Sequence, residues 1–445
     1  MSLVITKGIR KISTVLAVIL LCLISLTGCG ISEMVGEAVD SAVKKIFGTP
    51  GEGLEKPEIT GFASESGEDH SSPYHGEEPV IIEETESAVT EEFTVPEAGA
   101  IDPVEQDDDD ASEKDMEDER NYCFSIISTP DKQLYMELYN CFYQMRENVL
   151  LSTLDADRVD RIFNYVMMDH PELFFVEGYR ITQTTRDGVP VQLEISGRYT
   201  CSAEDRIAKE QAIRARANEV LKGVPEDGNE YEKVKYIFEW IIDNTEYNLS
   251  APENQNITSV FLNGESVCQG YSMAAKYLLD RMGIFCTIVY GRADGESHSW
   301  NLVRMDGTYC YMDTTWGDAS YRNSDSAIMK HTNYNYFGCN DEILLRTHQI
   351  DSPAPLPPCT SLDEYFYVKE SRYFTSPDLE RLRAIFEYER KLGSHVFSIR
   401  CSDETVYNTM KQELFENNGI FDLLPDSRSV KYIKDDREYT LSFSV

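Results

Sequence analysis

Two short stretches of this 445-residue chain decide its fold: ESVCQGYS at positions 265–272 and HSWNLVRMDGTYCYMDTTW at positions 298–316. The first opens a segment whose apolar residues recur at helical spacing, and the second is typical of two β-strands around a tight turn. Together they place Cys268, His298 and Asp313 in that order along the chain. A thiol, an imidazole and a carboxylate are the parts of a thiolate nucleophile, its general base and the group that orients the base.

The register of the second stretch predicts that its histidine and aspartate are neighbours. Asp306-Gly307 is a strong signal for a two-residue hairpin loop. Counting outward from this loop sets Trp300 opposite Asp313, so His298 is a diagonal neighbour of the carboxylate on the same face. Diagonal pairs are about 7–8 Å apart at the backbone, within reach of long side chains. We therefore expect one ring nitrogen to face the carboxylate and the other to face the thiol.

The position of Cys268 at the first turn of its predicted helix favours the ionised thiol. Unsatisfied backbone N–H groups and the helix dipole stabilise an anion at such a position. Beside an imidazolium at His298, the pKa of this thiol is expected to fall well below ~8.5. The N–H group of Cys268 is a candidate for one lobe of an oxyanion hole, and Gly270 is expected to leave the approach to the sulfur open.

These motifs resemble the transglutaminase-like superfamily, in its bacterial, protease-like branch, over about residues 229–320. The resemblance is carried by VCQGYS, by a Gly-Ile-Phe-Cys run and by the ordered Cys, His-x-Trp-Asn and Asp-x-Thr-Trp residues. It implies an α+β fold with a papain-like core, in which a helix bearing the cysteine packs on an antiparallel sheet. It also implies acyl transfer on amides through a thioester, with Cys268 as nucleophile, His298 as general base and then acid, and Asp313 as orienter.

The oxyanion site is the one part of the resemblance that the sequence leaves open. Members of the superfamily commonly place an aromatic or amide side chain upstream of the cysteine, and many have a tyrosine where this chain has Thr258. Gln255 and Asn256 are the amide candidates in the stretch QNITSVF, which begins at position 255. Spacing alone does not choose between them.

The first 29 residues are typical of a signal peptide. A positively charged start is followed by a short apolar stretch, Val15 to Leu26, and then by Leu-Thr-Gly-Cys ending at Cys29. This ending resembles the lipobox of bacterial lipoproteins, which implies cleavage before Cys29 and a diacylglycerol on its thiol. The mature chain is then expected to be anchored through Cys29 to the extracytoplasmic face of a bacterial membrane.

Residues 30–120 have the composition of an acidic, disordered linker. They contain 28 Asp or Glu against 5 Lys or Arg, and they supply most of the formal net charge of −37. Such a segment buries too little apolar surface to offset its conformational entropy, so it is expected to extend the folded part away from the membrane. So acidic a chain is an unlikely partner for nucleic acid.

The folded part begins near residue 121 and is expected to have three regions: a helical and hairpin region at 121–228, the catalytic core at 229–350 and an accessory unit at 360–445. A proline-rich stretch at 353–358 marks the last boundary. Periodicity predicts helices at 135–150, 156–168, 203–221, 231–244 and 268–282, and strands at 174–181, 189–200, 284–290, 298–304 and 308–314. The accessory unit is expected to have a βαβαββ order, with strands near 365–368, 395–401, 430–433 and 439–443 and helices at 377–391 and 404–417.

Eight cysteines besides Cys22, Cys29 and Cys268 remain after these assignments, as disulfides or as buried free thiols. Zinc motifs of the CxxC or HExxH type and a clear calcium loop are not found in the sequence, so neither a metal nor a cofactor is expected. The four histidines His170, His331, His348 and His395 receive no role.

The favoured function is a membrane-anchored, cell-surface cysteine enzyme that acts on peptide or glutamine amides of a protein, peptide or cell-wall substrate. Each site residue alone also fits a structural role, such as a small buried cysteine or an aspartate that stabilises a turn. The first alternative is therefore a non-catalytic binding module of the same fold for cell-wall or protein ligands. The second is a structural tether that works through its linker and its C-terminal unit.

Overall fold

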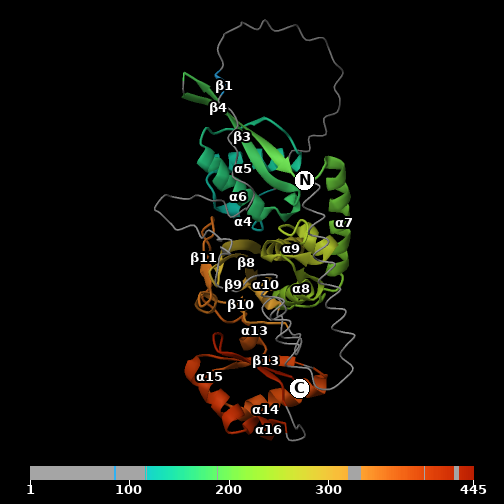
Figure 1. The fold of residues 1–445 in the computed structure, drawn as a ribbon, viewed down its shortest axis with the longest axis vertical. Helices are drawn as coiled ribbons and strands as arrows, with labels where there is room; N and C mark the ends of the chain where they lie inside the picture. Colours follow the sequence, from blue (N-terminus) through green and yellow to red (C-terminus); the bar gives the residue numbers. More distant parts are fainter. Residues whose placement is uncertain are drawn as a thin grey trace, which may run out of the picture. The chain divides into compact units, whose positions relative to one another are not determined.

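The computed structural model describes residues 85–86, 116, 118–318 except 188, 332–394, 396–424 and 430–444. All of them belong to one compact unit, Ser71–Val445 (Figure 1). The predicted signal peptide 1–29 with Cys29, nearly all of the linker 30–120, and both His331 and His395 lie outside the described residues. Helices and mainly antiparallel sheets alternate along the described chain, which confirms the α+β fold class.

The central sheet is antiparallel and has five strands in the order β10-β9-β8-β7-β11. Its strands are β7 (Cys286–Ala293), β8 (Glu296–Met305), β9 (Thr308–Met312), β10 (Phe337–Cys339) and β11 (His348–Ile350). Met305 pairs with Thr308 and Asn301 with Met312, so the hairpin register predicted from Asp306-Gly307 is confirmed.

The predicted strand at 308–314 is too long, and its last pairs do not form. β9 ends at Met312, and Asp313 is the N-cap of the short helix α10 (Thr314–Gly317), where its side chain accepts a hydrogen bond from the backbone of Trp316. Trp300 pairs with Val289 of β7 in the central sheet. Asp313 leaves the strand because aspartate is a preferred N-cap whose carboxylate satisfies a free helical N–H group.

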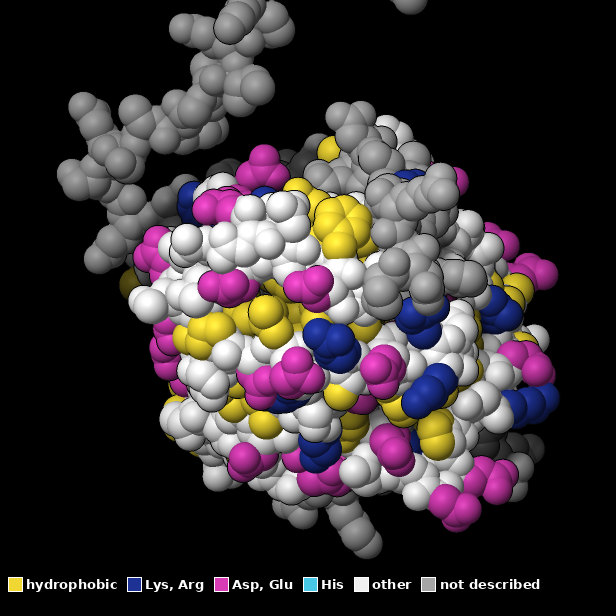
Figure 2. All heavy atoms as spheres, turned by 90° about the horizontal axis from the view of Figure 1, so that it is seen from below, with side chains coloured by type: hydrophobic (Ala, Val, Ile, Leu, Met, Phe, Trp, Pro, Cys, Tyr) yellow, Lys and Arg dark blue, Asp and Glu magenta, His cyan; other side chains and the backbone are white. Residues whose placement is uncertain are grey.

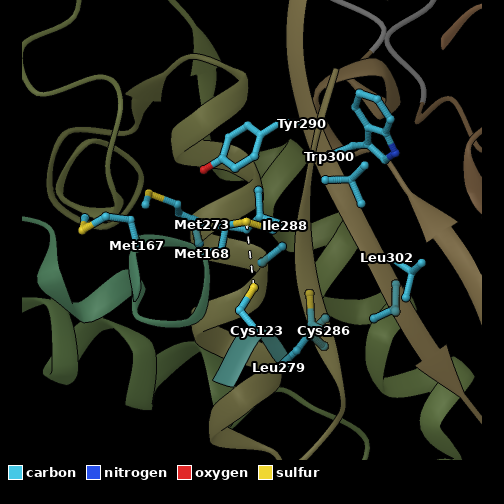
Figure 3. Close-up of a cluster of buried hydrophobic side chains, with 14 of the residues drawn as sticks. Cys123, Met167, Met168, Met273, Leu279, Cys286, Ile288, Tyr290, Trp300 and Leu302 are labelled. Carbon is cyan, nitrogen blue, oxygen red and sulfur yellow. Dashed lines mark hydrogen bonds between the residues drawn. The ribbon is translucent and has the colours of Figure 1, made fainter. Parts of the chain in front are cut away.

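The helix that bears the cysteine, α9 (Cys268–Arg281), packs on β7 and β8 of this sheet. Its C-cap is Met282, and Gly283 follows with a φ of +72°, the left-handed conformation that glycine readily adopts after a helix. In Figure 3, side chains of α9, β7 and β8 meet Cys123 and Met168, whose sulfur atoms lie 3.9 Å apart. The predicted papain-like layering, a helix on an antiparallel sheet, is thus present.

Helix α8 (Glu230–Asn244) covers α9 and α10, and it begins with a capping box formed by Asn229 and Glu232. A π-helical turn, η2 (Ser259–Asn263), and a small parallel ladder of β5 (Glu246–Tyr247) and β6 (Glu265–Ser266) lead directly into Cys268. These two features fix the approach of the backbone to the start of α9.

The region before the core contains α4 (Tyr122–Ile126), α5 (Thr129–Tyr143), α6 (Ala156–Asp169), the 3-10 turn η1 (Pro171–Leu173) and the long helix α7 (Ala203–Leu221). Its sheet has the order β1-β3-β4-β2, with β1 (Thr85–Glu86), β2 (Val149–Leu150) and the predicted hairpin of β3 (Val176–Arg186) and β4 (Val189–Tyr199). The predicted helix 135–150 is wrong at its end. Positive φ angles at Met145 and Asn148 stop α5, and β2 then pairs with β4.

Two separate hydrophobic cores lie along the described chain. The first runs from Met116 to Tyr367 and joins the N-terminal helices to the central sheet and α9. The second contains Phe374 to Phe443 and belongs to the C-terminal unit. The change from one core to the other therefore follows Tyr367 rather than the proline-rich stretch at 353–358.

The C-terminal unit has a four-stranded sheet in the order β12-β13-β15-β14. Its elements are β12 (Tyr373–Phe374), α14 (Leu379–Leu392), β13 (Val396–Cys401), α15 (Glu404–Lys411) with η3 (Gln412–Glu416), α16 (Gly419–Leu423), β14 (Tyr432–Asp435) and β15 (Thr440–Ser444). The predicted strand at 365–368 is wrong, because these residues enter the short helix α13 (Phe366–Lys369). Tyr365, Phe366 and Tyr367 are all buried, whereas a strand with one solvent face buries alternate residues.

The described surface mixes charges of both signs. On the face seen in Figure 2, acidic and basic side chains alternate, with hydrophobic side chains between them. Among the described residues, helices are too short or too polar to cross a lipid bilayer. In the part of the chain that the structure describes, nine cysteines are free thiols; seven of them are buried, and Cys201 and Cys268 are partly exposed.

Candidate active site

Cys268 occupies the first position of α9, directly after the N-cap residue Val267. Burial raises the pKa of the Cys268 thiol, but the hydrogen bond and charge of His298 lower it more, together with hydrogen bonds from the backbone and side chain of Ser299. The net effect holds the pKa of Cys268 below its ordinary value. These contributions stabilise a thiolate, and the residue is partly exposed.

His298 lies on β8 with 7% of its surface exposed, and its Nε2 is 2.8 Å from Oδ2 of Asp313. Burial lowers the pKa of His298, but the charge and hydrogen bond of Asp313, with a smaller contribution from Cys268, raise it to about 10. Because Nε2 faces the carboxylate, Nδ1 is left to face the thiol. The two shifts therefore both favour a thiolate–imidazolium pair over the neutral pair.

Asp313 is fully buried and holds three hydrogen bonds with its two carboxylate oxygens. Oδ1 accepts from the backbone of Trp316 at 3.0 Å, and Oδ2 accepts from His298 and from His348, whose Nε2 is 3.1 Å away. Burial raises the pKa of Asp313, but the charges and hydrogen bonds of His298 and His348 hold it well below its ordinary value. This carboxylate is thus the ionised group that orients the base.

His348 is the site residue that the sequence missed. It begins β11, the edge strand that pairs with β7, and its side chain is buried against Trp300, Trp316 and Tyr336. It follows Asp313 by 35 residues, and β11 is only three residues long. Neither feature leaves a periodic signal, so only the three-dimensional arrangement brings this histidine to the carboxylate.

The side chains of His298, Asp313 and His348 are also close enough to share a metal ion, with ligand atoms within 4.8 Å of one another. Zinc is bound at about 2.0–2.2 Å by nitrogen and carboxylate ligands. In the structure these atoms already satisfy one another at hydrogen-bond lengths, and Nδ1 of His298 faces a thiol. We therefore interpret the cluster as a hydrogen-bonded acid–base site; the absence of a metal or cofactor stays a prediction.

The two amide candidates for the oxyanion site lie in the turn before η2. Gln255 is exposed, while Asn256 is buried and its side-chain oxygen accepts from the backbone of Thr258 at 2.8 Å. The hydroxyl of Thr258 is buried and, among the described residues, has no hydrogen-bond partner. The oxyanion role of Gln255 or Asn256 stays a prediction, as does that of the N–H group of Cys268 at the start of α9.

Two further residues near the thiol were not foreseen. Gln269 donates from Nε2 to the hydroxyl of Tyr290 at 2.8 Å, and both side chains are buried. Burial raises the pKa of Tyr290, and the charge of Cys268 raises it further. The expectation for Gly270 needs correction: a Cβ there would overlap Oγ of Ser266, so this glycine allows the close packing of α9 on the preceding segment.

Comparison with known proteins agrees with this geometry. Residues 214–314, which include Cys268, His298 and Asp313, match the model of the Transglutaminase-like superfamily. The Kyphoscoliosis peptidases of Mus musculus and Homo sapiens are each 22% identical to this chain over 166 residues, which is 33% of this chain and 25% of the relative. The chain thus spans about a quarter of the length of these relatives.

A solved structure described as a TGase has 16% identity and a TM-score of 0.23, and the match covers 35% of this chain and 47% of that chain. The family match falls on α8, α9 and the strands β7 to β9, the elements that carry the three site residues. Residues 214–314 therefore form a transglutaminase-like domain.

Proposed function

We propose that this chain is a cysteine acyl-transfer enzyme, a peptidase, amidase or transglutaminase, that acts on peptide or glutamine amides through a thioester on Cys268. One observation carries the proposal: the imidazole of His298 lowers the pKa of the Cys268 thiol, while Asp313, 2.8 Å from the ring, raises the pKa of the imidazole. Such a pair stores the nucleophile and the general acid in their reactive forms before a substrate binds.

In the first half of the reaction, the Cys268 thiolate attacks the carbonyl carbon of the amide and forms a tetrahedral intermediate. The N–H groups at the start of α9 stabilise the negative charge that develops on the oxygen. The imidazolium of His298 then donates its proton to the leaving amine, so the carbon–nitrogen bond breaks and the thioester remains.

In the second half, water or a primary amine attacks the thioester, and His298 accepts a proton from it before the thiol leaves. Asp313 keeps the ring oriented and stabilises the imidazolium in both halves. Whether water or an amine attacks decides between hydrolysis and transamidation.

Incubation of the purified chain with peptide libraries, with and without a primary amine, tests this function. We expect a covalent acyl adduct on Cys268 by mass spectrometry and a hydrolysed or transamidated product. The product must disappear in Cys268→Ala and persist in Cys201→Ala, the other partly exposed cysteine. Equal turnover by Cys268→Ala would exclude the thioester, and ligand binding without turnover in the wild type would favour the binding-module alternative.

We further propose that Cys29 carries a lipid, that the acidic segment 30–120 acts as a tether, and that the substrates are proteins, peptides or cell-wall peptides outside the cell. The support is the apolar stretch before Cys29 and the excess of acidic residues after it. Metabolic labelling with a radioactive fatty acid in a bacterial host should label the wild type and leave Cys29→Ala unlabelled. Equal labelling of both would contradict lipidation at Cys29.

A further inference from the structure

A hydrogen-bonded chain, buried except at Thr347, leads from the carboxylate of Asp313 to the C-terminal unit. Nε2 of His348 lies 3.1 Å from Asp313, and Nδ1 of the same ring lies 2.9 Å from Oγ1 of Thr347. This hydroxyl is 2.7 Å from the hydroxyl of Tyr336, which donates to Oε1 of Glu438 at 2.8 Å. The contacts are continuous, so the position of Glu438 is transmitted to Asp313 through three intervening side chains.

Glu438 belongs to the turn between β14 and β15 of the C-terminal unit. Its Oε2 accepts from Nη1 of Arg400 on β13 at 3.0 Å, and the two residues are 0% and 1% exposed. A buried ion pair is tolerated only when its remaining hydrogen-bonding groups are satisfied. Tyr336, a residue of the first core, supplies the partner that Oε1 needs. Glu438, at the end of this series of hydrogen bonds, is therefore held by Arg400 of the C-terminal unit. Tyr336 of the catalytic core supplies its remaining hydrogen bond.

The same turn contacts the wall of the active site. Arg437 pairs with Asp294, which follows β7, at 2.5 Å, and its guanidinium lies 5.6 Å from the ring centre of Trp316. The Trp316 ring in turn lies 6.1 Å from that of His298. The C-terminal unit thus meets the core at the site itself, through one exposed ion pair and one hydrogen-bonded chain.

The number of protons shared between Glu438 and Asp313 decides which group donates and which accepts in each hydrogen bond. With Glu438 as the carboxylate partner of Arg400, the Tyr336 hydroxyl donates to it and accepts from Thr347. Thr347 must then accept from Nδ1 of His348, whose Nε2–H donates to Asp313. Each of these contacts then holds one proton.

We propose that the C-terminal unit completes the catalytic site, because Glu438, acting through Tyr336 and Thr347, holds His348 as the positioning residue that fixes the Asp313 carboxylate against His298. This inference rests on the proposed function of Cys268. It assigns a role in the chemistry to a unit in which the sequence shows no chemical motif. His348 acts through Asp313 and does not touch the reacting atoms.

A purely structural role for the chain predicts different results. Loss of a buried hydrogen bond would then lower the melting temperature but leave the reactivity of the folded site unchanged. A positioning role predicts that the thiolate is less stabilised in the folded variants. The titratable groups around the thiol and its base are His298, Asp313, His348, Tyr290 and Tyr336, and the rate at which iodoacetamide alkylates Cys268 as a function of pH reports their combined effect.

The decisive variants are Tyr336→Phe, His348→Phe and His348→Gln in the complete chain. Tyr336→Phe keeps the ring and removes only the hydroxyl. Its matched control is Tyr365→Phe, because Tyr365 is equally buried and donates to the backbone of Asn335 outside the chain of contacts. His348→Gln keeps an N–H donor on the side chain, and His348→Phe removes it.

We expect alkylation of Cys268 near pH 6 to slow about tenfold in His348→Phe and about threefold in Tyr336→Phe, with the acid limb of the profile moved to higher pH. His348→Gln should recover part of the loss, and Tyr365→Phe should match the wild type. If Tyr336→Phe and Tyr365→Phe both keep the wild-type profile, the inference is wrong while the proposed function stands. A wild-type Cys268 that reacts no faster than Cys201 would overturn both.

Discussion

Helix α9 carries two polar clusters, which differ in solvent exposure and in how many of their hydrogen-bonding positions are used. Near its middle, Nζ of Lys276 donates to the carboxylate of Asp280 at 2.9 Å, to the carbonyl of Arg120 at 2.9 Å and to that of Cys286 at 3.0 Å. All three donor positions of the ammonium group are used, and the residue is fully buried. At the first position of the same helix, Cys268 is partly exposed, and His298 and Ser299 lower the pKa of its thiol.

Both clusters keep charged groups in a low dielectric, but only one of them can react. Burial lowers the pKa of Lys276, but the charges of Asp280 and Asp169 and the hydrogen bond to Asp280 together raise it more, so the ammonium form is retained as a fixed structural group. At Cys268 the charges are also paired, yet the residue is partly exposed. A buried charged group whose hydrogen-bonding positions are all used, such as Lys276, is thus a structural group. A charged group on a partly exposed residue, such as Cys268, is a candidate for a chemical role.

The largest effect is expected from removal of the Cys268 thiol. Cys268→Ala should lower amide turnover by about 10⁴-fold or more, since loss of the nucleophile of a triad removes covalent catalysis. The melting temperature should stay close to that of the wild type, because alanine fits the first position of a helix. Thermal unfolding with turnover measured on the same samples checks both parts, and Cys201→Ala serves as the control. A large loss of stability in Cys268→Ala would make this cysteine structural.

Disruption of the Lys276 cluster should lower the stability of the protein and leave the reactivity of Cys268 unchanged. Lys276→Met leaves a buried carboxylate and two carbonyl groups without their donor, so the free energy of unfolding should fall by about 3–5 kcal/mol. Below the unfolding transition, alkylation of Cys268 should proceed at the wild-type rate.

Urea unfolding of Lys276→Met is best compared with Lys222→Met. Lys222 pairs with Glu219 on the surface, where both side chains are more than half exposed, and such a pair contributes about 0–1 kcal/mol. Equal losses in the two variants would mean that Lys276 is no better buried or paired than a surface lysine.

Asp313→Asn sharpens the comparison at the orienting carboxylate. Asparagine keeps the N-cap acceptor but removes the charge that raises the pKa of His298 to about 10. The imidazolium and, through it, the thiolate should be less stabilised, so alkylation near pH 6 should slow by about tenfold or more.

The same carboxylate controls how stability depends on pH. Because the folded pKa of His298 is raised above its ordinary 6.5, its contribution is complete below that pH and is lost as pH rises through about 10. The depressed pKa of Asp313 contributes above its ordinary value of 3.8 and is lost on acidification. The dependence of the denaturant midpoint on pH, measured from pH 4 to 10, should be weaker in Asp313→Asn than in the wild type. An unchanged dependence would mean that His298 and Asp313 do not stabilise each other.

The smallest effect is expected where α9 packs on the preceding segment. Alanine normally stabilises a helix by about 1 kcal/mol over glycine, but a Cβ at Gly270 would overlap Oγ of Ser266 and lie 3.0 Å from the carbonyl of Asn254. Gly270→Ala should therefore destabilise the chain by about 1–3 kcal/mol in urea. The double variant with Ser266→Gly should recover part of the loss, and no recovery would point to another cause.

The sequence predicted what local signals determine. Asp306-Gly307 fixed the register of β8 and β9, and Gly283 marked the end of α9. Asp313 was predicted to lie in the strand at 308–314 and instead caps α10. Its carboxylate accepts a hydrogen bond from the backbone of Trp316, so the strand ends before it. The strand predicted at 365–368 failed because its aromatic residues pack on more than one side.

The contribution of the C-terminal unit could not be read from periodicity. His348 lies on a strand of three residues, and Glu438 lies in a turn 90 residues farther along the chain. Pairing of β11 with β7, and of the turn with Tyr336, is set by tertiary packing and leaves no spacing in the sequence. Local patterns thus predicted that His298 and Asp313 lie together and that Cys268 begins a helix, while the contact of His348 with Asp313 required the complete fold.

The most direct test of the central claim compares two cysteines of one molecule. Cys268 and Cys201 are both partly exposed, but the pKa of Cys268 is lowered, chiefly by His298 acting against burial, whereas burial raises the pKa of Cys201. Limited alkylation with iodoacetamide at pH 6, followed by peptide mass spectrometry, should modify Cys268 at least about tenfold faster than Cys201. Equal rates, or faster labelling of Cys201, would contradict a stabilised thiolate at the start of α9.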